Sequence, residues 1–170
     1  LAGCEAAYQA AKRGCQVTLY DMKPDKFSPA HSSEMLAELV CSNSLRSDAP
    51  DSAVGLLKHE MRQLGSLLMK TADQTAVPAG KALAVDRELF AEQITKTMEE
   101  HPGITIVREE IESLPEQPQE PVVLATGPLT SEPMAESLAS LTGKDRLAFY
   151  DAIAPIIHAD SLNMEIIYQK

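Results

Sequence analysis

The sequence predicts an α/β fold in which helices alternate with buried strands. Residues 1–13 have a face of small side chains with helical spacing, and the apolar run CQVTLYD comes directly after them. Later in the chain, ITIVRE and VVLATG are runs of strongly β-forming residues that follow a helical stretch. A chain of 170 residues with 44% hydrophobic content can bury one sizeable core. We therefore expect one domain, or one domain and part of another.

The first predicted elements are a helix over residues 1–13 and a strand over residues 15–21 that ends at Asp21. Gly14 stands between them, where the C-terminal cap of a helix belongs. The segment 24–50 is rich in loop-forming residues, but SEMLAELV within it has the composition of two helical turns. We expect a long loop with one short helical piece.

The middle of the chain is predicted to be helical. Asp51 or Ser52 can cap a helix whose apolar residues recur at i, i+4, i+7 and i+11 on one face. These residues are Leu57, Met61, Leu64 and Leu68. A further helix is expected after Asp86, with Val85 and Phe90 placed as a hydrophobic staple around the cap. The sequence HPG ends this helix.

Two strands and a helix are predicted in the remainder. ITIVRE (104–109) and VVLATG (122–127) are the strands, and the proline-rich stretch 115–121 separates them. A helix over residues 131–141 and a mixed tail from Leu147 follow.

Composition excludes several classes of function. The net charge of −10 argues against a nucleic-acid-binding module, since phosphate contacts need clustered Lys and Arg. No apolar run approaches the roughly 20 residues of a membrane helix, and the N-terminus does not read as a signal peptide, so we expect a soluble, cytoplasmic protein. The three cysteines are irregularly spaced, which favours reduced thiols, and the four histidines are scattered. No metal site is predicted.

A helix followed by a buried strand that ends in an acid is typical of the second half of a nucleotide-binding βαβ unit. In that unit a glycine lets the helix pack closely on the sheet, and an acid about 20 residues later binds the ribose hydroxyls. Gly3 and Asp21 occupy these positions, and the first strand and earlier glycines would lie upstream of Leu1. The alternative is a packing glycine and a strand-end acid of any α/β protein.

The strand end VVLATGP favours the nucleotide-binding interpretation. An apolar strand that runs into Ala125, Thr126 and Gly127 brings backbone close to a bulky neighbour, because glycine puts no side chain in the way. Such strand ends are common near the cofactor in flavoproteins with dinucleotide folds. The alternative is an ordinary transition from strand to turn.

Cys41 is a candidate nucleophile. A cysteine reacts as the thiolate, so it must be partly exposed and near positive charge or a helix N-terminus. Cys41 follows an apolar segment, precedes Ser42, Asn43 and Ser44, and has Arg46 five residues later. The alternative is a buried structural thiol, which is also the interpretation we give Cys4 and Cys15.

The chain resembles the folate- and FAD-dependent tRNA (uracil-5-)-methyltransferases, and more distantly the larger GidA-type tRNA-modifying flavoproteins. The matching blocks occur in order over nearly the whole chain: LAGCEAAYQAAKRGCQVTLYDMKP, SPAHSSEMLAELVCSNSLRSD, SAVGLLKHEMRQLGSLLM, VPAGKALAVDRELFAEQIT, VVLATGPLTS and FYDAIAPI. The resemblance implies a Rossmann-like FAD-binding domain of the GidA-type fold, lacking its first strand. It implies that residues 1–170 form a partial FAD-binding domain, with about 46–110 as an inserted helical or substrate-facing subregion. The C-terminal region of the family would lie beyond Lys170.

The resemblance also implies an activity. A flavin would take a one-carbon unit from 5,10-methylenetetrahydrofolate and deliver it, with reducing equivalents from NAD(P)H, to C5 of the T-loop uridine in tRNA. The family places the cysteine of VCSNSLR, here Cys41, beside the flavin, where it attacks the uracil or handles the flavin-bound methylene. The acidic chain suggests that tRNA is bound mainly by regions absent here, and the sequence leaves the oligomeric state open.

Further site residues follow from the resemblance position by position. Gly3 would support the pyrophosphate turn, and Asp21, where the family often has glutamate, would bind the adenosine ribose. The remaining cofactor residues would be Met22 and Lys23 beside the adenosine, Ser42, Asn43 and Ser44 near the flavin, and Ala125, Thr126 and Gly127 along the cofactor backbone. Asp86 and Arg87 would border the site, although Asp86 also suits a plain helix cap.

Two other functions remain open at this point. One is a generic FAD- or NAD-dependent oxidoreductase that transfers hydride to a small molecule without folate or tRNA. The other is a non-catalytic nucleotide-binding fragment, since a pyrophosphate without Gly-x-Gly loses its cradle at the helix N-terminus. We expect the chain in isolation to be inactive.

Overall fold

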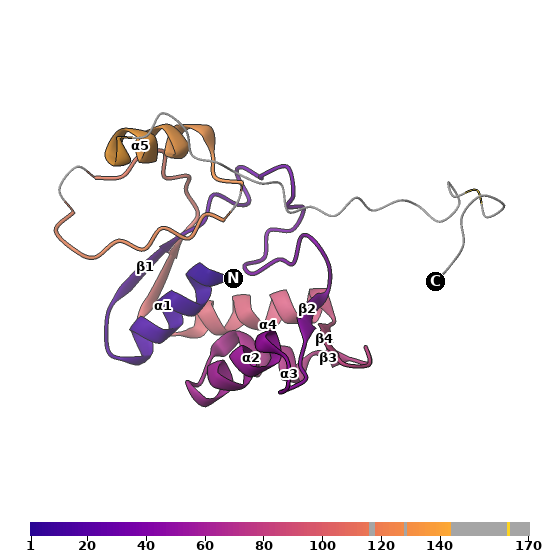
Figure 1. The fold of residues 1–170 in the computed structure, drawn as a ribbon. Helices are drawn as coiled ribbons and strands as arrows, with labels where there is room; N and C mark the ends of the chain where they lie inside the picture. Colours follow the sequence, from indigo (N-terminus) through magenta and orange to yellow (C-terminus); the bar gives the residue numbers. More distant parts are fainter. Residues whose placement is uncertain (116–117, 128, 144–162, 164–170) are drawn as a thin grey trace.

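A computed structural model describes residues 1–115, 118–127, 129–143 and 163 (Figure 1). Within them, helices and strands alternate in the order α1, β1, β2, α2, α3, β3, β4, α4, β5 and α5. The strands form a parallel pair, β1 with β5, and a three-stranded sheet in the order β2, β4, β3. The mixed α/β class predicted from the sequence is confirmed.

The first helix and strand form where the sequence predicts them. α1 (Ala2–Lys12) has alanines on its inner face, and β1 (Val17–Tyr20) follows after a short turn. Gly14 makes that turn with a φ of 89°, and its N–H donates to the carbonyl of Ala11 at 2.9 Å. A left-handed backbone of this kind suits glycine, which explains the residue at the helix end.

The parallel pair defines the edge at which the predicted site lies. β5 (Ile104–Val107) pairs with β1 from Val17 opposite Ile104 to Tyr20 opposite Val107. The Asp21 N–H continues this ladder by donating to the Val107 carbonyl at 3.0 Å. The two parallel strands therefore end at the same edge of the sheet, with Asp21 next to the end of β5.

The sequence did not predict the second sheet, which is antiparallel. It contains β2 (Ser44–Ser47), β3 (Ala76–Val77) and β4 (Ala82–Val85). These strands are two to four residues long, and half of their residues are serine or alanine, which give no strong β signal. β4 forms because the side chains of Leu83 and Val85 are buried in the core.

One long leucine-faced helix was predicted after residue 51, and this prediction is wrong in its extent and its buried face. Two helices form, α2 (Ala53–Gln63) and α3 (Leu67–Gln74), because Gly65 adopts a φ of 73° between them. Leu57 and Leu64 are 55% and 77% exposed, so they are not core residues. The predicted cap is confirmed, since Ser52 Oγ accepts from Gly55 N at 3.1 Å.

The helix predicted after Asp86 is confirmed in detail. α4 (Arg87–Glu100) begins with the Asp86 carboxylate accepting from the N–H groups of Glu88 and Leu89, both at 3.1 Å. Val85 and Phe90 are both fully buried, as a hydrophobic staple requires. α4 supplies the largest side chains of the core, which are Phe90, Ile94 and Met98.

Two other predicted elements do not form. Residues 122–127 are not a strand, and Val122 and Val123 are 55% and 70% exposed, because no described strand pairs with them. SEMLAELV is irregular instead of helical, since Ala37 has a φ of 57° and its neighbour Leu36 donates its N–H to Thr95 Oγ1.

The predicted C-terminal helix is confirmed as α5 (Glu132–Thr142). The FYDAIAPI block and most of the tail from Leu147 lie outside the described residues.

Candidate functional site

The acid at the end of β1 is open to a ligand. Asp21 has a side chain that is 20% exposed, and its Oδ1 accepts from the Lys23 N–H at 2.9 Å. Within the described part of the chain, Oδ2 accepts no hydrogen bond. A carboxylate at the carboxyl end of a parallel strand can accept hydrogen bonds from ribose hydroxyls.

Gly3 lies beside the segment that contains the predicted ATG sequence. A Cβ on Gly3 would lie 3.5 Å from Ala125 Cβ and 3.8 Å from Leu19 Cδ1, which are ordinary contact distances. The start of α1 is thus packed near Ala125, although packing alone does not require glycine.

Thr126 and Gly127 are exposed and joined to the residues that follow them. Thr126 Oγ1 and Thr130 Oγ1 are 2.7 Å apart, and Thr130 Oγ1 also donates to the Gly127 carbonyl at 3.0 Å. Gly127 has a φ of 78°, which explains the glycine by backbone conformation.

The segment 22–40 connects the strand-end acid to Cys41. Lys23 is buried, and its Nζ donates to the Met35 carbonyl, so its ammonium lies among residues of this segment. Further along, Leu36, Ala37 and Leu39 are buried in the core and anchor the segment against it. Met22, at the start, is half-buried.

Hydrogen bonds also order the interior of this segment. Ser28 Oγ lies 2.6 Å from His31 Nδ1, and Glu38 accepts from the N–H groups of Ser32 and Ser33. Burial and the nearby Lys23 ammonium lower the pKa of His31. Burial raises the pKa of Glu38, but the hydrogen bonds from the serines outweigh it and the net shift is downward.

The loop that carries Cys41 is held at both ends against the start of α4. Asn43 exchanges two hydrogen bonds with Val85, from Val85 N to Asn43 O at 2.9 Å and from Asn43 Nδ2 to Val85 O at 3.2 Å. Arg87 Nη1 donates to the Leu39 carbonyl at 3.4 Å. Cys41 lies between these anchors and is partly exposed, as a reactive thiol must be.

The hydroxyl groups next to Cys41 have local partners. Ser42 Oγ accepts from the Ser44 N–H at 3.2 Å, and Ser44 Oγ accepts from the Arg46 N–H at 3.1 Å. Asp86 caps α4 at the same place, so its carboxylate has a structural role whether or not it contacts a ligand.

The other two cysteines differ from Cys41. Cys4 is buried in the core, and burial raises the pKa of its thiol, which keeps it protonated and unreactive. Cys15 is exposed in the turn before β1.

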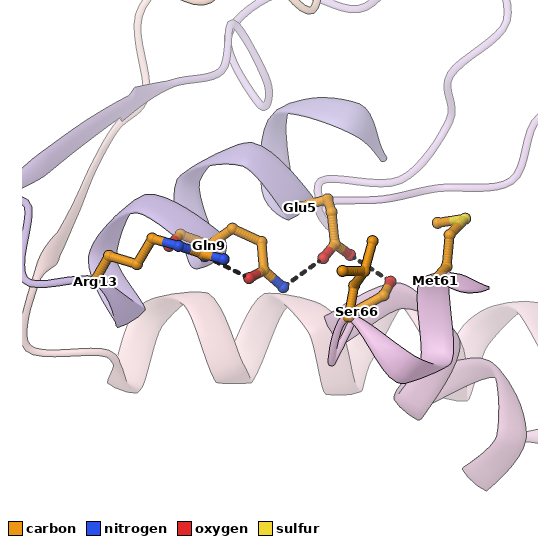
Figure 2. Close-up of a pocket in the computed structure, with 6 residues that line it drawn as sticks. Glu5, Gln9, Arg13, Met61 and Ser66 are labelled. Atoms are coloured by element: carbon orange, nitrogen blue, oxygen red, sulfur yellow. Dashed lines mark hydrogen bonds between the residues drawn. The ribbon is translucent and has the colours of Figure 1, made fainter. Parts of the chain in front are cut away.

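A cavity between α1 and the α2–α3 turn is lined by none of the predicted site residues. It has a volume of about 350 Å³ and is lined by residues of α1 and the α2–α3 turn, namely Glu5, Gln9, Arg13, Met61, Leu64 and Ser66 (Figure 2). Glu5 accepts from Ser66 Oγ at 2.8 Å and from the Leu67 and Leu68 N–H groups. Burial raises the pKa of Glu5, but these bonds and one from Gln9 Nε2 lower it below its usual value. This carboxylate therefore joins α1 to the start of α3.

The structure thus brings the predicted residues together in two groups. Gly3, Asp21 and Ala125 lie around β1 and the start of α1, whereas Cys41 and Asn43 lie beside the start of α4. Sequence reasoning missed Arg108, which follows β5 and lies near Asp21. The sequence placed Arg108 near the end of the predicted strand 104–109, but no pairing of that strand with the strand that ends at Asp21 was predicted.

Among the described residues, no group of His, Cys, Asp and Glu has the arrangement of a metal site. Nor does any helix in those ranges have the length and apolar character needed to cross a membrane.

Comparisons with known proteins match the chain along its whole length. The family model for glucose inhibited division protein A covers residues 1–170. A protein of Desulfotalea psychrophila named methylenetetrahydrofolate-tRNA-(uracil-5-)-methyltransferase TrmFO is 66% identical over 100% of the chain. Proteins with the same name from Oleidesulfovibrio alaskensis and Moorella thermoacetica are 61% and 57% identical over 97% and 99% of it. The chain spans about 38% of the length of each of these relatives.

Proposed function

Because the chain belongs to the glucose inhibited division protein A family, we propose that it carries the FAD-binding and cysteine-bearing region of a tRNA (uracil-5-)-methyltransferase. The substrates would be 5,10-methylenetetrahydrofolate and the T-loop uridine of tRNA, with NAD(P)H as reductant. The name that these relatives share supports the folate and the tRNA as substrates. The structural observation that carries the proposal is that one anchored segment, 22–40, joins the open carboxylate of Asp21 to the partly exposed thiol of Cys41.

The residues around β1 fit the adenosine half of FAD. Asp21 Oδ2 accepts no hydrogen bond from the described residues, so this carboxylate oxygen suits a ribose hydroxyl. Ala125 and Gly127 are exposed on the segment that passes Gly3, which supports their assignment beside the cofactor. When bound, FAD would carry the one-carbon unit and the reducing equivalents.

Cys41 is the proposed catalytic thiol. Its loop is fixed by Asn43 and by Arg87, so the sulfur is held in place without being buried. A thiolate that adds to C6 of uracil makes C5 nucleophilic, which is what methylation at C5 needs. Ser42 and Ser44 order the loop through their mutual hydrogen bond and are proposed to lie near the flavin.

The tRNA would be bound mainly by other parts of the enzyme. The net charge of −10 opposes phosphate binding by this chain alone. Within the region of about 46–110, the part that precedes β5 begins just after the Cys41 loop and is proposed to face the substrate.

The test replaces Cys41 with alanine in the full gene product and Cys15, also accessible, with alanine as the matched control. Cys41→Ala should keep its flavin absorbance but lose methylation of tRNA by about 10³-fold or more, whereas Cys15→Ala should methylate normally. Normal turnover by Cys41→Ala would rule out the catalytic assignment. A gene product without flavin, even after FAD is added, would rule out the flavoprotein.

A second measurement separates the two possible roles of the thiol. A T-loop RNA containing 5-fluorouridine should trap a covalent adduct with the wild-type protein if Cys41 attacks C6, and no adduct should form with Cys41→Ala. Equal trapping by both proteins would assign the attack on uracil to a different nucleophile.

A further inference from the structure

Arg108 is a cation held at the same sheet edge as the proposed ribose-binding acid. Its Nη1 donates to the carbonyls of Lys23 at 3.3 Å and Glu34 at 3.2 Å. The same nitrogen lies 3.9 Å from Asp21 Oδ1, too far for a direct hydrogen bond but close enough for attraction. The guanidinium is therefore fixed by two backbone carbonyls while it faces the carboxylate.

This geometry differs from that of a purely structural ion pair. Arg108 and Asp21 side chains are 28% and 20% exposed, so the pair is open to solvent at the strand ends. Because the guanidinium does not hydrogen-bond the carboxylate directly, Asp21 keeps its acceptor capacity. All the hydrogen bonds of Arg108 to described residues start at Nη1, which leaves Nε and Nη2 available as donors within that part of the chain.

Arg108 also fixes the path of the backbone in the segment 22–40. Its two carbonyl partners lie at the beginning of the segment and near its middle, so one side chain brings Lys23 and Glu34 together. Lys23 Nζ makes a second tie, to the Met35 carbonyl. Without Arg108, the backbone that follows Asp21 would keep the tie of Lys23 and the ion pair of Lys26 with Glu110, but would lose the bond that joins Lys23 to Glu34 through one side chain.

We propose that Arg108 is a positioning residue for the adenosine end of the dinucleotide: it holds the Asp21 carboxylate and the backbone after it in the arrangement that binds the ribose. This inference rests on the proposed FAD-binding function and adds to it a residue from β5. It acts through Asp21 and the segment 22–40.

The experiment measures FAD binding to the flavin-free full gene product by quenching of flavin fluorescence. ADP, which carries only the adenosine end, is used to displace FAD. Arg108→Gln should raise the Kd for FAD about ten-fold and weaken ADP by the same factor, since both lose the same positioning. Arg108→Lys should recover part of the loss, because lysine keeps the charge but lacks the planar fork. Arg13→Gln is the matched control and should leave both affinities unchanged, because Arg13 is exposed and, among the described residues, its side chain donates only to Gln9.

The outcomes separate this inference from the proposed function. A wild-type protein that binds neither FAD nor ADP overturns the proposed function. A wild-type protein that binds both, beside an Arg108→Gln variant with affinities within about two-fold of it, overturns only the role of Arg108. A melting temperature lowered by more than about 5 °C in Arg108→Gln, with no recovery of affinity in Arg108→Lys, would show that the residue merely supports the fold.

Discussion

Two regions of this molecule treat their polar side chains differently. The helical region consists of α2, α3, α4 and the β2–β4–β3 sheet, and one of its charged groups, Arg62, is paired with two carboxylates. Arg62 donates to both Asp48 and Asp73, with closest distances of 2.8 and 2.7 Å, and this pairing raises the pKa of the guanidinium. In the edge region, formed by the ends of β1 and β5 with residues 22–44, Lys26 pairs with Glu110, but the more buried cations Lys23 and Arg108 donate to backbone carbonyls.

The difference predicts whether a substitution in each region would affect stability or ligand binding. Side chains of the helical region are satisfied by the fold, so replacing them should lower the free energy of unfolding. Side chains of the edge region hold the backbone in place while Asp21 and Cys41 stay partly exposed, so replacing these two should affect ligands more than folding.

The largest expected effect is on the core of the helical region. Phe90→Ala should lower the free energy of unfolding of the chain by about 3–5 kcal/mol, since Phe90 is fully buried and its removal leaves a cavity. Urea unfolding measures this loss. Leu89→Ala, next to it and 48% exposed, is the control and should cost about 0.5 kcal/mol or less. Equal losses in both variants would contradict the burial on which the comparison depends.

The next effect tests the edge region. Asp21→Asn in the full gene product should raise the Kd for FAD by about ten-fold or more, because a neutral amide binds ribose hydroxyls less strongly than a carboxylate. Its free energy of unfolding should change by no more than about 0.5 kcal/mol. Asp25→Asn, at an exposed position four residues on, is the control. A large loss of stability without loss of FAD binding would reverse the assignment of Asp21 to the ligand.

The sequence predicted the elements of the edge region better than its contacts. α1, β1 and β5 could be predicted because helical spacing and β-branched runs are local signals. The proximity of Arg108 to Asp21 depends on the register between strands more than 80 residues apart, which no local pattern contains. The same limit explains the wrong strand at 122–127, since a β-forming run becomes a strand only when another strand pairs with it.

Outside the edge region, the predictions that were wrong or lacking have local causes. The caps at Ser52 and Asp86 were predictable from residue type, but the helix predicted after residue 51 breaks at Gly65, and Leu57 and Leu64 of its predicted face are exposed. The β2–β4–β3 sheet was missed because its strands are two to four residues long. In the site, the position of Cys41 in a partly exposed loop matched the pattern, whereas the burial of Lys23 was not foreseen, since lysines are rarely buried.

A smaller effect concerns the tie between α1 and α3. The folded-state pKa of Glu5 is below its usual value, so its contribution to stability is complete above pH 4.5 and is lost as the pH falls through the lower, folded value. Glu5→Gln should therefore be less stable than the wild type by about 1 kcal/mol at pH 7, and the difference should shrink below pH 4. Urea unfolding at several pH values measures it. A difference that does not change with pH would mean that the carboxylate charge is not what joins the helices.

The smallest expected effect is that of replacing Asp86. It tests whether this residue belongs to the helical region alone or to both regions. Its carboxylate accepts from two N–H groups at the start of α4, and the anchored Cys41 loop lies beside it. Asp86→Ala should cost about 1 kcal/mol of unfolding free energy, because it removes the cap, while Asp86→Asn should cost only a few tenths, since asparagine caps equally well. Methylation by the full gene product then separates the roles. If Asp86→Asn keeps the stability and the activity, Asp86 is a cap of the helical region. If it keeps the stability and loses activity, the carboxylate also acts in the site, and the boundary between the two regions runs through this residue.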